Sequence, residues 1–125
     1  MQIEGIDHLV LTVRDVAVTE AFYTEVLGMR AELFGDGRHA LRCGRQQINL
    51  HPTGNQFEPK AIRPVPGSAD ICLIASGTIE ATLRHLRAVR IEAQAGPVPR
   101  TGALGPMTSI YLRDPDQNLV EIAHY

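Results

Sequence analysis

An internal repeat restricts the fold of this chain more than any other feature of its sequence. When the sequence is displaced by 62 residues, segment 5–12 (GIDHLVLT) lies over segment 67–74 (GSADICLI). Each segment is typical of an apolar strand that follows a glycine, and each leads into a helix. The first helix is predicted from an N-cap at Asp15 to a left-handed end at Gly28, and the second begins near Thr78. We therefore expect two copies of one supersecondary unit.

Three short strand-like runs follow each predicted helix. They lie near 30–34, 39–43 and 46–51 in the first half, and near 91–94, 108–113 and 118–123 in the second. The last two runs are joined by Asp114–Asn118, a turn-forming cluster in which proline fixes φ and Asp or Asn bonds the backbone. The order βαβββ, repeated twice, predicts an α+β fold. We expect the chain to form a single domain, residues 1–125, with modules at 1–55 and 66–125.

Two segments are too rich in proline and glycine for a regular element. Residues 52–67 are predicted to connect the modules. Residues 95–107 are predicted to form a long loop, and loops of that length in compact domains tend to be functional. We interpret this second segment as a lid, in which Arg100 is the only charged residue.

Four predicted strands have one wholly apolar face and an opposite face with a group that can bind a metal ion. Side chains alternate between the two faces of a strand, so the alternation can be followed along the sequence. The metal-binding groups are His8, His51, Asp70 and Glu121. Two imidazoles and two carboxylates suit one divalent ion such as Zn, Ni, Co, Mn or Fe. Spacing alone fits four separate structural groups equally well.

Other side chains are expected to have structural roles. The buried stripe of the first helix is predicted at Val18, Phe22 and Val26, widened by Tyr23 and Leu27. The two cysteines lie far apart, and we expect them to be small apolar groups rather than a disulfide. The remaining histidines have no partner pattern and are predicted at the surface: His39, His85 and His124.

Composition excludes several classes of function. Twelve basic and fourteen acidic residues give a net charge of −2, which lacks the basic footprint of a nucleic-acid-binding protein. No apolar run is long enough to span a bilayer, and residues 1–5 do not resemble a signal peptide. We therefore expect a cytoplasmic protein whose partner is a small molecule.

Two long motifs resemble the opening and the closing of glyoxalase I-like proteins. Residues 6–15 with 21–29 contain the pattern FYxxxLG, and residues 112–122 contain DPDxNxxE. The chain resembles the vicinal-oxygen-chelate (glyoxalase/bleomycin-resistance/extradiol-dioxygenase) superfamily, and within it the subgroup called glyoxalase domain-containing protein five. The resemblance implies two tandem βαβββ modules that form a curled eight-stranded sheet around a metal site.

The same resemblance implies a set of metal ligands. His8 and Glu121 match the first-strand and eighth-strand positions of the superfamily. Asp70 occupies the fifth-strand position, where relatives usually have His. The fourth-strand position falls on Asn49, and His51 is predicted to substitute for it.

These residues favour a metal-dependent lyase or isomerase of glyoxalase I type, acting on a small substrate with vicinal oxygens. Glu121 is the expected general base, and Arg100 is a candidate partner for an anionic substrate group. Thr12 stands where glyoxalase I has a glutathione-binding arginine, so glutathione use is doubtful. A non-catalytic antibiotic-binding protein and an Fe(II) ring-cleaving dioxygenase remain alternatives. A homodimer is expected, because small curled sheets leave unpaired edges.

Overall fold

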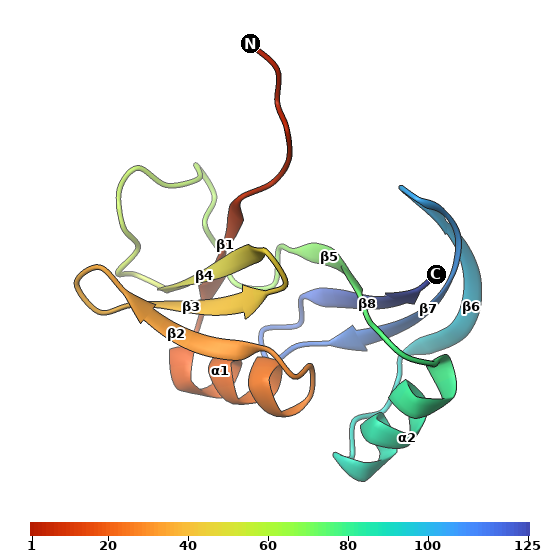
Figure 1. The fold of residues 1–125 in the computed structure, drawn as a ribbon. Coiled ribbons are helices and arrows are strands. Elements are labelled where there is room, and N and C mark those ends of the chain that lie inside the picture. Colours follow the sequence, from red (N-terminus) through yellow and green to blue (C-terminus); the bar gives the residue numbers. More distant parts are fainter. The chain divides into compact units, whose positions relative to one another are not determined.

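The computed structural model describes all residues from Met1 to Tyr125, which form two compact units, Met1–Pro66 and Gly67–Tyr125 (Figure 1). The first unit contains β1 (His8–Val13), α1 (Val16–Glu25), β2 (Arg30–Phe34), β3 (Arg38–Cys43) and β4 (Gln46–Pro52). The second contains β5 (Asp70–Ile74), α2 (Ile79–Ala88), β6 (Ala95–Gly102), β7 (Gly105–Arg113) and β8 (Leu119–His124). The predicted α+β class and the repeated βαβββ order are confirmed. The eight strands form two four-stranded sheets, each within one unit.

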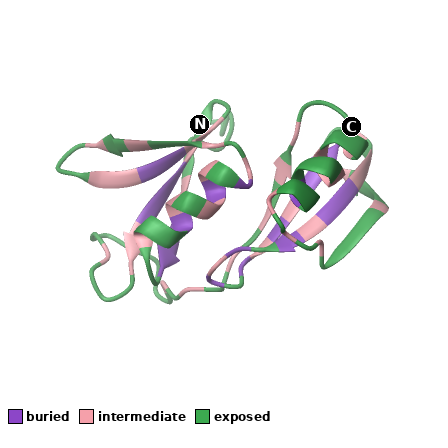
Figure 2. Ribbon diagram, turned by 90° about the horizontal axis from the view of Figure 1, so that it is seen from below, coloured by how far each residue is buried: buried purple, intermediate pink, exposed green.

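Sheet A of the first unit has the strand order β1-β4-β3-β2. The first and last strands of the unit are parallel neighbours, with Leu11 opposite Leu50, and the other pairs are antiparallel. One face of the sheet is apolar and buried, because Val13, Leu41 and Leu50 are almost inaccessible to solvent. Helix α1 lies on this face (Figures 1 and 2).

Helix α1 begins at the predicted N-cap, where the Asp15 carboxylate accepts a hydrogen bond from the Val18 N–H. The predicted Tyr23 and Val26 are buried, but Val18 is half exposed and the buried Thr19 was not predicted. Thr19 fits the buried face because its hydroxyl donates to the Asp15 carbonyl oxygen. Beyond the helix, Gly28 has φ +67°, as its predicted left-handed position requires.

Sheet B of the second unit repeats this arrangement with the order β5-β8-β7-β6. Its apolar face holds Leu112, Val120 and Ile122, and α2 contributes the buried Leu86. Helix α2 begins at Thr78, as predicted, and the Thr78 hydroxyl accepts a hydrogen bond from the Ala81 N–H.

The predicted lid is wrong. Residues 95–102 are strand β6, which pairs with β7 as a hairpin that turns at 103–104, and no strand covers the predicted run 91–94. Strand β6 is an edge strand with a single neighbour. An edge strand tolerates prolines such as Pro97 and Pro99, since one row of its N–H groups has no strand to bond.

Two histidines predicted at the surface instead connect a helix to its sheet. His124 is buried, with its ring nitrogens 3.0 Å from the Thr82 hydroxyl of α2 and 3.2 Å from the Gly77 carbonyl oxygen. His39 on β3 lies 2.7 Å from the Glu20 carboxylate of α1. Each module therefore has a histidine between helix and strand.

The Asp114–Asn118 turn joins the start of β5 to the β7–β8 connection. The buried Asp114 carboxylate accepts hydrogen bonds from the backbone N–H groups of Asp116 and Asn118, and from the Asn118 amide. The Asn118 amide oxygen in turn accepts from the Ala69 N–H at 2.9 Å. No helix of the structure has the length and apolar character required to cross a membrane.

Candidate functional site

The candidate residues lie on the faces of the two sheets opposite the helices, which we call the polar faces. On sheet A the strand register forms two rows of side chains and two further pairs on this face. The rows are His8–Gln47–Arg42–Arg30, then Val10–Asn49–Ala40–Glu32, and beyond them the pairs Thr12–His51 and Arg38–Phe34. The candidate histidines are His8 in the first row and His51 in the pair with Thr12.

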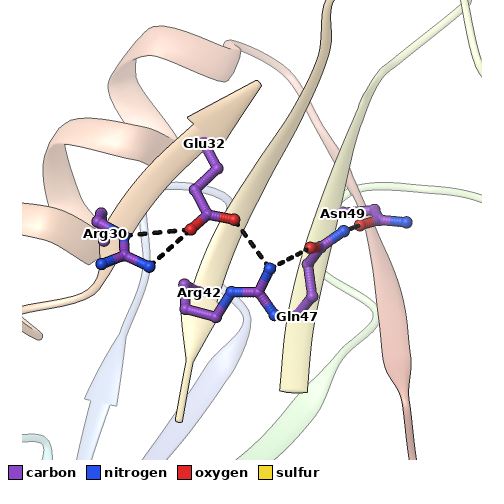
Figure 3. A network of polar contacts seen from close by, with 5 residues as sticks. All are labelled: Arg30, Glu32, Arg42, Gln47 and Asn49. Atoms are coloured by element: carbon purple, nitrogen blue, oxygen red, sulfur yellow. Dashed lines mark hydrogen bonds and ion pairs between the residues drawn. The ribbon is translucent and has the colours of Figure 1, made fainter. Parts of the chain in front are cut away.

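A continuous polar network fills the two rows (Figure 3). Glu32 accepts hydrogen bonds from Arg30 at 2.8 and 3.1 Å and from Arg42 at 2.9 Å. Arg42 also donates to the Gln47 side chain, whose amide donates to Asn49. Hydrogen bonds from Arg42, then Arg30, lower the pKa of Glu32, so the carboxylate is ionised at neutral pH. The network neutralises Arg30 and Arg42 in part and orients Asn49.

His8 has a suitable arrangement for a metal ligand. It is half exposed, and its Nδ1 lies 2.7 Å from an Asp7 carboxylate oxygen. A carboxylate on one ring nitrogen fixes the tautomer and directs the other nitrogen towards a ligand, as is common among metal-binding histidines.

His51 is too far from His8 to share one ion with it. It pairs with Thr12, four positions along β1 from His8, a separation of roughly 13 Å along the strand direction. Two imidazoles on one sheet face cannot both reach an ion across that span with bonds of about 2.1 Å. His51 instead packs against Phe57, with ring centroids 5.1 Å apart. We therefore leave His51 out of the proposed ligand set.

On sheet B, Glu121 occupies the centre of the polar face. The register places it between Cys72 on β5 and Tyr111 on β7. Its Oε1 atom is buried and has no hydrogen-bond partner. The Ser109 hydroxyl, two positions along β7 on the same face, is also buried without a partner. Buried polar groups are nearly always satisfied, so these two atoms indicate a missing polar partner.

The neighbouring Cys72 is unsuited to act as a nucleophile. Burial, then the charge of Glu121 and a hydrogen bond to it, and then the charge of Asp70 raise the pKa of Cys72 to about 11. The thiol is therefore protonated at neutral pH, and a thiol is a far weaker nucleophile than a thiolate. Cys43 and Cys72 form no disulfide; Cys43 is partly buried and Cys72 is exposed.

Asp70 and Arg100 lie on either side of the Glu121 row. Asp70 pairs with Leu119, two positions from Glu121 on the same face, and is exposed. Arg100, now placed on β6, donates to the Tyr111 hydroxyl at 3.0 Å, and its guanidinium lies 5.5 Å from the Tyr111 ring centre. Tyr111 thus connects Arg100 to the Glu121 row, a link that sequence reasoning missed because the register is not visible in the sequence.

The structure has no group of three or more His, Cys, Asp or Glu side chains arranged to hold a metal ion. The predicted ligands are divided between the units, with His8 and His51 in the first and Asp70 and Glu121 in the second. The unpartnered Glu121 oxygen and the oriented His8 ring are donors of the type that a divalent ion accepts.

Comparison with known proteins assigns the family. Residues 5–122 match the model of the glyoxalase/bleomycin resistance protein/dioxygenase superfamily. The chain belongs to this superfamily. Superfamily membership accounts for the tandem modules and the paired motifs at the two ends of the chain. One scaffold hosts unrelated chemistries, however, so membership alone does not identify the reaction.

Two curated relatives are similar to this chain over its whole length. Virulence protein STM3117 of Salmonella typhimurium is 53% identical over 125 residues, which are 87% of that protein. Its crystal structure has a TM-score of 0.98, covering 100% of this chain and 99% of that one. Glyoxalase domain-containing protein RDO1 of Mycosarcoma maydis is 49% identical over 100% of this chain and 70% of that protein.

A lactoylglutathione lyase from Agrobacterium tumefaciens is similar in fold alone. Its structure has a TM-score of 0.74 at 24% identity, covering 98% of this chain and 95% of that one.

Proposed function

We propose that the protein is a divalent-metal-dependent lyase or isomerase of glyoxalase I type, acting on a small molecule with vicinal oxygens. The observation that supports this best is the Glu121 carboxylate, whose Oε1 is buried without a partner on the polar face of sheet B. A buried carboxylate oxygen without a partner is costly unless a ligand or an ion satisfies it. Superfamily membership makes a metal-dependent reaction the natural candidate.

His8 and Glu121 are the proposed ligands, with Asp70 as a further carboxylate on the Glu121 face. A bound divalent ion would supply Lewis-acid stabilisation of negative charge on substrate oxygens. Glu121 is also the proposed general base, which removes a proton from the carbon next to the substrate carbonyl and returns it to the neighbouring carbon. The proton leaves one carbon and is added to its neighbour, while the hydroxyl proton of the first carbon passes to the former carbonyl oxygen, so the reaction is an isomerisation with no external oxidant.

Arg100 and Thr12 are the proposed substrate contacts. Arg100 offers the Nη2 group that its bonds to Tyr111 and Pro99 leave unused. Thr12 offers a hydroxyl where glyoxalase I would have a guanidinium, so we expect poor turnover of the methylglyoxal–glutathione hemithioacetal. The substrate is then a different oxo or hydroxy compound.

Elemental analysis of the protein purified without a histidine tag tests the proposed metal dependence. We expect one divalent ion per chain in the wild-type protein and its loss in the His8→Ala and Glu121→Gln variants. His85→Ala, which removes an exposed histidine of α2, is the matched control and should retain the ion. Circular dichroism checks that each variant is folded. Metal content unchanged in the His8→Ala/Glu121→Gln double variant would refute the ligand assignment.

A second candidate function is non-catalytic binding of a small molecule such as an antibiotic. The superfamily whose model matches the chain includes bleomycin resistance proteins, which supports this alternative. A binding protein of this kind would need neither His8 nor Glu121. Metal-free protein that retains ligand binding after both substitutions would support the alternative over the lyase.

A further inference from the structure

Basic and aromatic side chains gather at the end of the polar face of sheet A farthest from His8. Arg38 on β3 and His51 on β4 both contact the Phe57 ring, which belongs to the connector after β4. The Arg38 guanidinium carbon lies 4.2 Å from the ring centre, and the His51 ring stands edge-on to it at 5.1 Å. Thr12 pairs with His51 on the other side. We call Thr12, Arg38, His51 and Phe57 the Arg38 cluster.

The charge of Arg38 has no compensating carboxylate. Arg30 and Arg42, on the same face of the sheet, both bond to Glu32. Arg38 forms no ion pair. Its guanidinium instead lies over the Phe57 ring in a cation–π contact. The carboxylate next to Phe57 in the sequence, Glu58, is paired with Lys60 at 2.9 Å. A half-buried guanidinium without a counter-ion is available to an external anion.

The other members of the cluster add uncharged hydrogen-bond donors. Burial, then the Arg38 charge, lowers the pKa of His51, so its imidazole is largely neutral at neutral pH and offers one N–H. Thr12 adds a hydroxyl and is 9% exposed. Within the connector, the Gln56 side chain donates to the Pro64 carbonyl oxygen at 3.1 Å. One full positive charge therefore lies among neutral donors and one aromatic ring.

We propose that the Arg38 cluster binds the carboxylate group of a small molecule. A guanidinium fork matches a carboxylate in two parallel hydrogen bonds, and the Thr12 and His51 donors complete its coordination. The Phe57 ring gives an apolar surface for the carbon atoms next to the carboxylate. A single positive charge suits a monoanion better than a phosphate ester, which has nearly two negative charges at neutral pH.

The inference identifies the charged group of the substrate and so rests on the proposed function for its biological meaning. Its test does not depend on metal or turnover, because all four residues lie in the first unit. Binding that persists in the Glu121→Gln variant would separate the carboxylate site from the proposed metal chemistry.

Titration of the full-length protein with benzoate tests the proposal. Calorimetry and the NMR signals of the His51 ring report binding, before and after treatment with a chelator. We expect saturable binding of benzoate and none of benzamide, which has the same shape without the charge. Arg38→Gln should weaken benzoate binding by roughly tenfold or more, the range for a hydrogen bond to a charged group. Arg45→Gln, an exposed arginine in the β3–β4 turn, is the matched control and should bind like wild type.

Three outcomes would overturn the carboxylate site. They are no benzoate binding by the wild-type protein, equal binding of benzamide, and unchanged binding in Arg38→Gln. If inorganic phosphate binds at His51 and benzoate does not, the ligand of the cluster is a phosphate rather than a carboxylate. Should Arg38→Gln fail to fold, the isosteric Thr12→Val variant provides the test, with benzoate binding expected to fall several-fold.

Discussion

Each histidine on the two sheets has a different neighbour, and that neighbour determines what the ring can do. His39 and His124 face the helices and bond to groups of α1 and α2. His8 is oriented by Asp7, and its other ring nitrogen has no protein partner. His51 packs on Phe57 next to Arg38. Strand alternation separated His8 and His51 from the other two, and the surroundings of each ring then distinguish the candidate ligand His8 from His51.

The Glu32 network predicts a pH-dependent contribution to stability. Hydrogen bonds from Arg42 and Arg30 lower the pKa of Glu32 from its ordinary value of 4.5. This contribution is fully present above that ordinary pKa and is lost as the pH falls through the lowered value of the folded state. We expect Glu32→Gln to unfold at lower urea concentration than wild type at pH 7, with a difference that shrinks as the medium is acidified below 4.5.

Glu58→Gln is the control for this experiment. It removes the carboxylate of an exposed ion pair with Lys60, and exposed pairs contribute little to stability. A Glu32→Gln difference that stays constant into strong acid would assign the effect to packing rather than to charge.

At the scale of elements, sequence patterns predicted most of the fold, and the errors have definite physical causes. Strand β2 was predicted at its observed bounds, because alternation and flanking glycines are local signals. Strand β6 was missed because its prolines and glycines exclude a central strand, and the sequence does not reveal which strand will lie at an edge. Thr19 was missed on the buried side of α1, because its hydroxyl is satisfied within the helix and it packs like an apolar residue.

The candidate site was less predictable than the fold, because it depends on register. The alternation of side chains along each strand predicted from the sequence that Glu121 and Asp70 lie on the same face of the sheet, as they do in sheet B. The offset between β1 and β4, which separates His51 from His8, comes from long-range pairing that no local pattern encodes. Arg38 and Tyr111 were overlooked for the same reason.

The β6–β7 hairpin depends on Gly96, which yields a prediction at this scale. Gly96 has φ +97°, and an added Cβ would overlap the Ser109 carbonyl oxygen and lie 3.0 Å from the Ile110 Cα. Gly105 has φ +123° with open space around it, so it is the matched control. We expect Gly105→Ala to lower the free energy of unfolding by about 1–2 kcal/mol and Gly96→Ala to lower it clearly more. Equal losses in urea unfolding would show that the close approach at Gly96 is unimportant.

At the scale of the whole molecule, each sheet has two edge strands that lack a neighbour on one side. These are β1 and β2 in sheet A, and β5 and β6 in sheet B. Unpaired edges promote association, and exposed apolar side chains such as Leu33 and Ile74 lie on two of them. We expect a homodimer, seen as one sedimentation boundary of dimer mass at micromolar concentration. A monomer across a concentration series would contradict this expectation.

In both units the first strand is a parallel neighbour of the last, β1 of β4 and β5 of β8. During synthesis on the ribosome, β5 therefore emerges with no partner on either side and waits for β8, roughly fifty residues later in the chain. Until then the apolar side chains of β5, among them Ile71 and Leu73, have no ladder to join. Strand β1 waits for β4 in the same way, so each module can complete its sheet only after its last strand has been made.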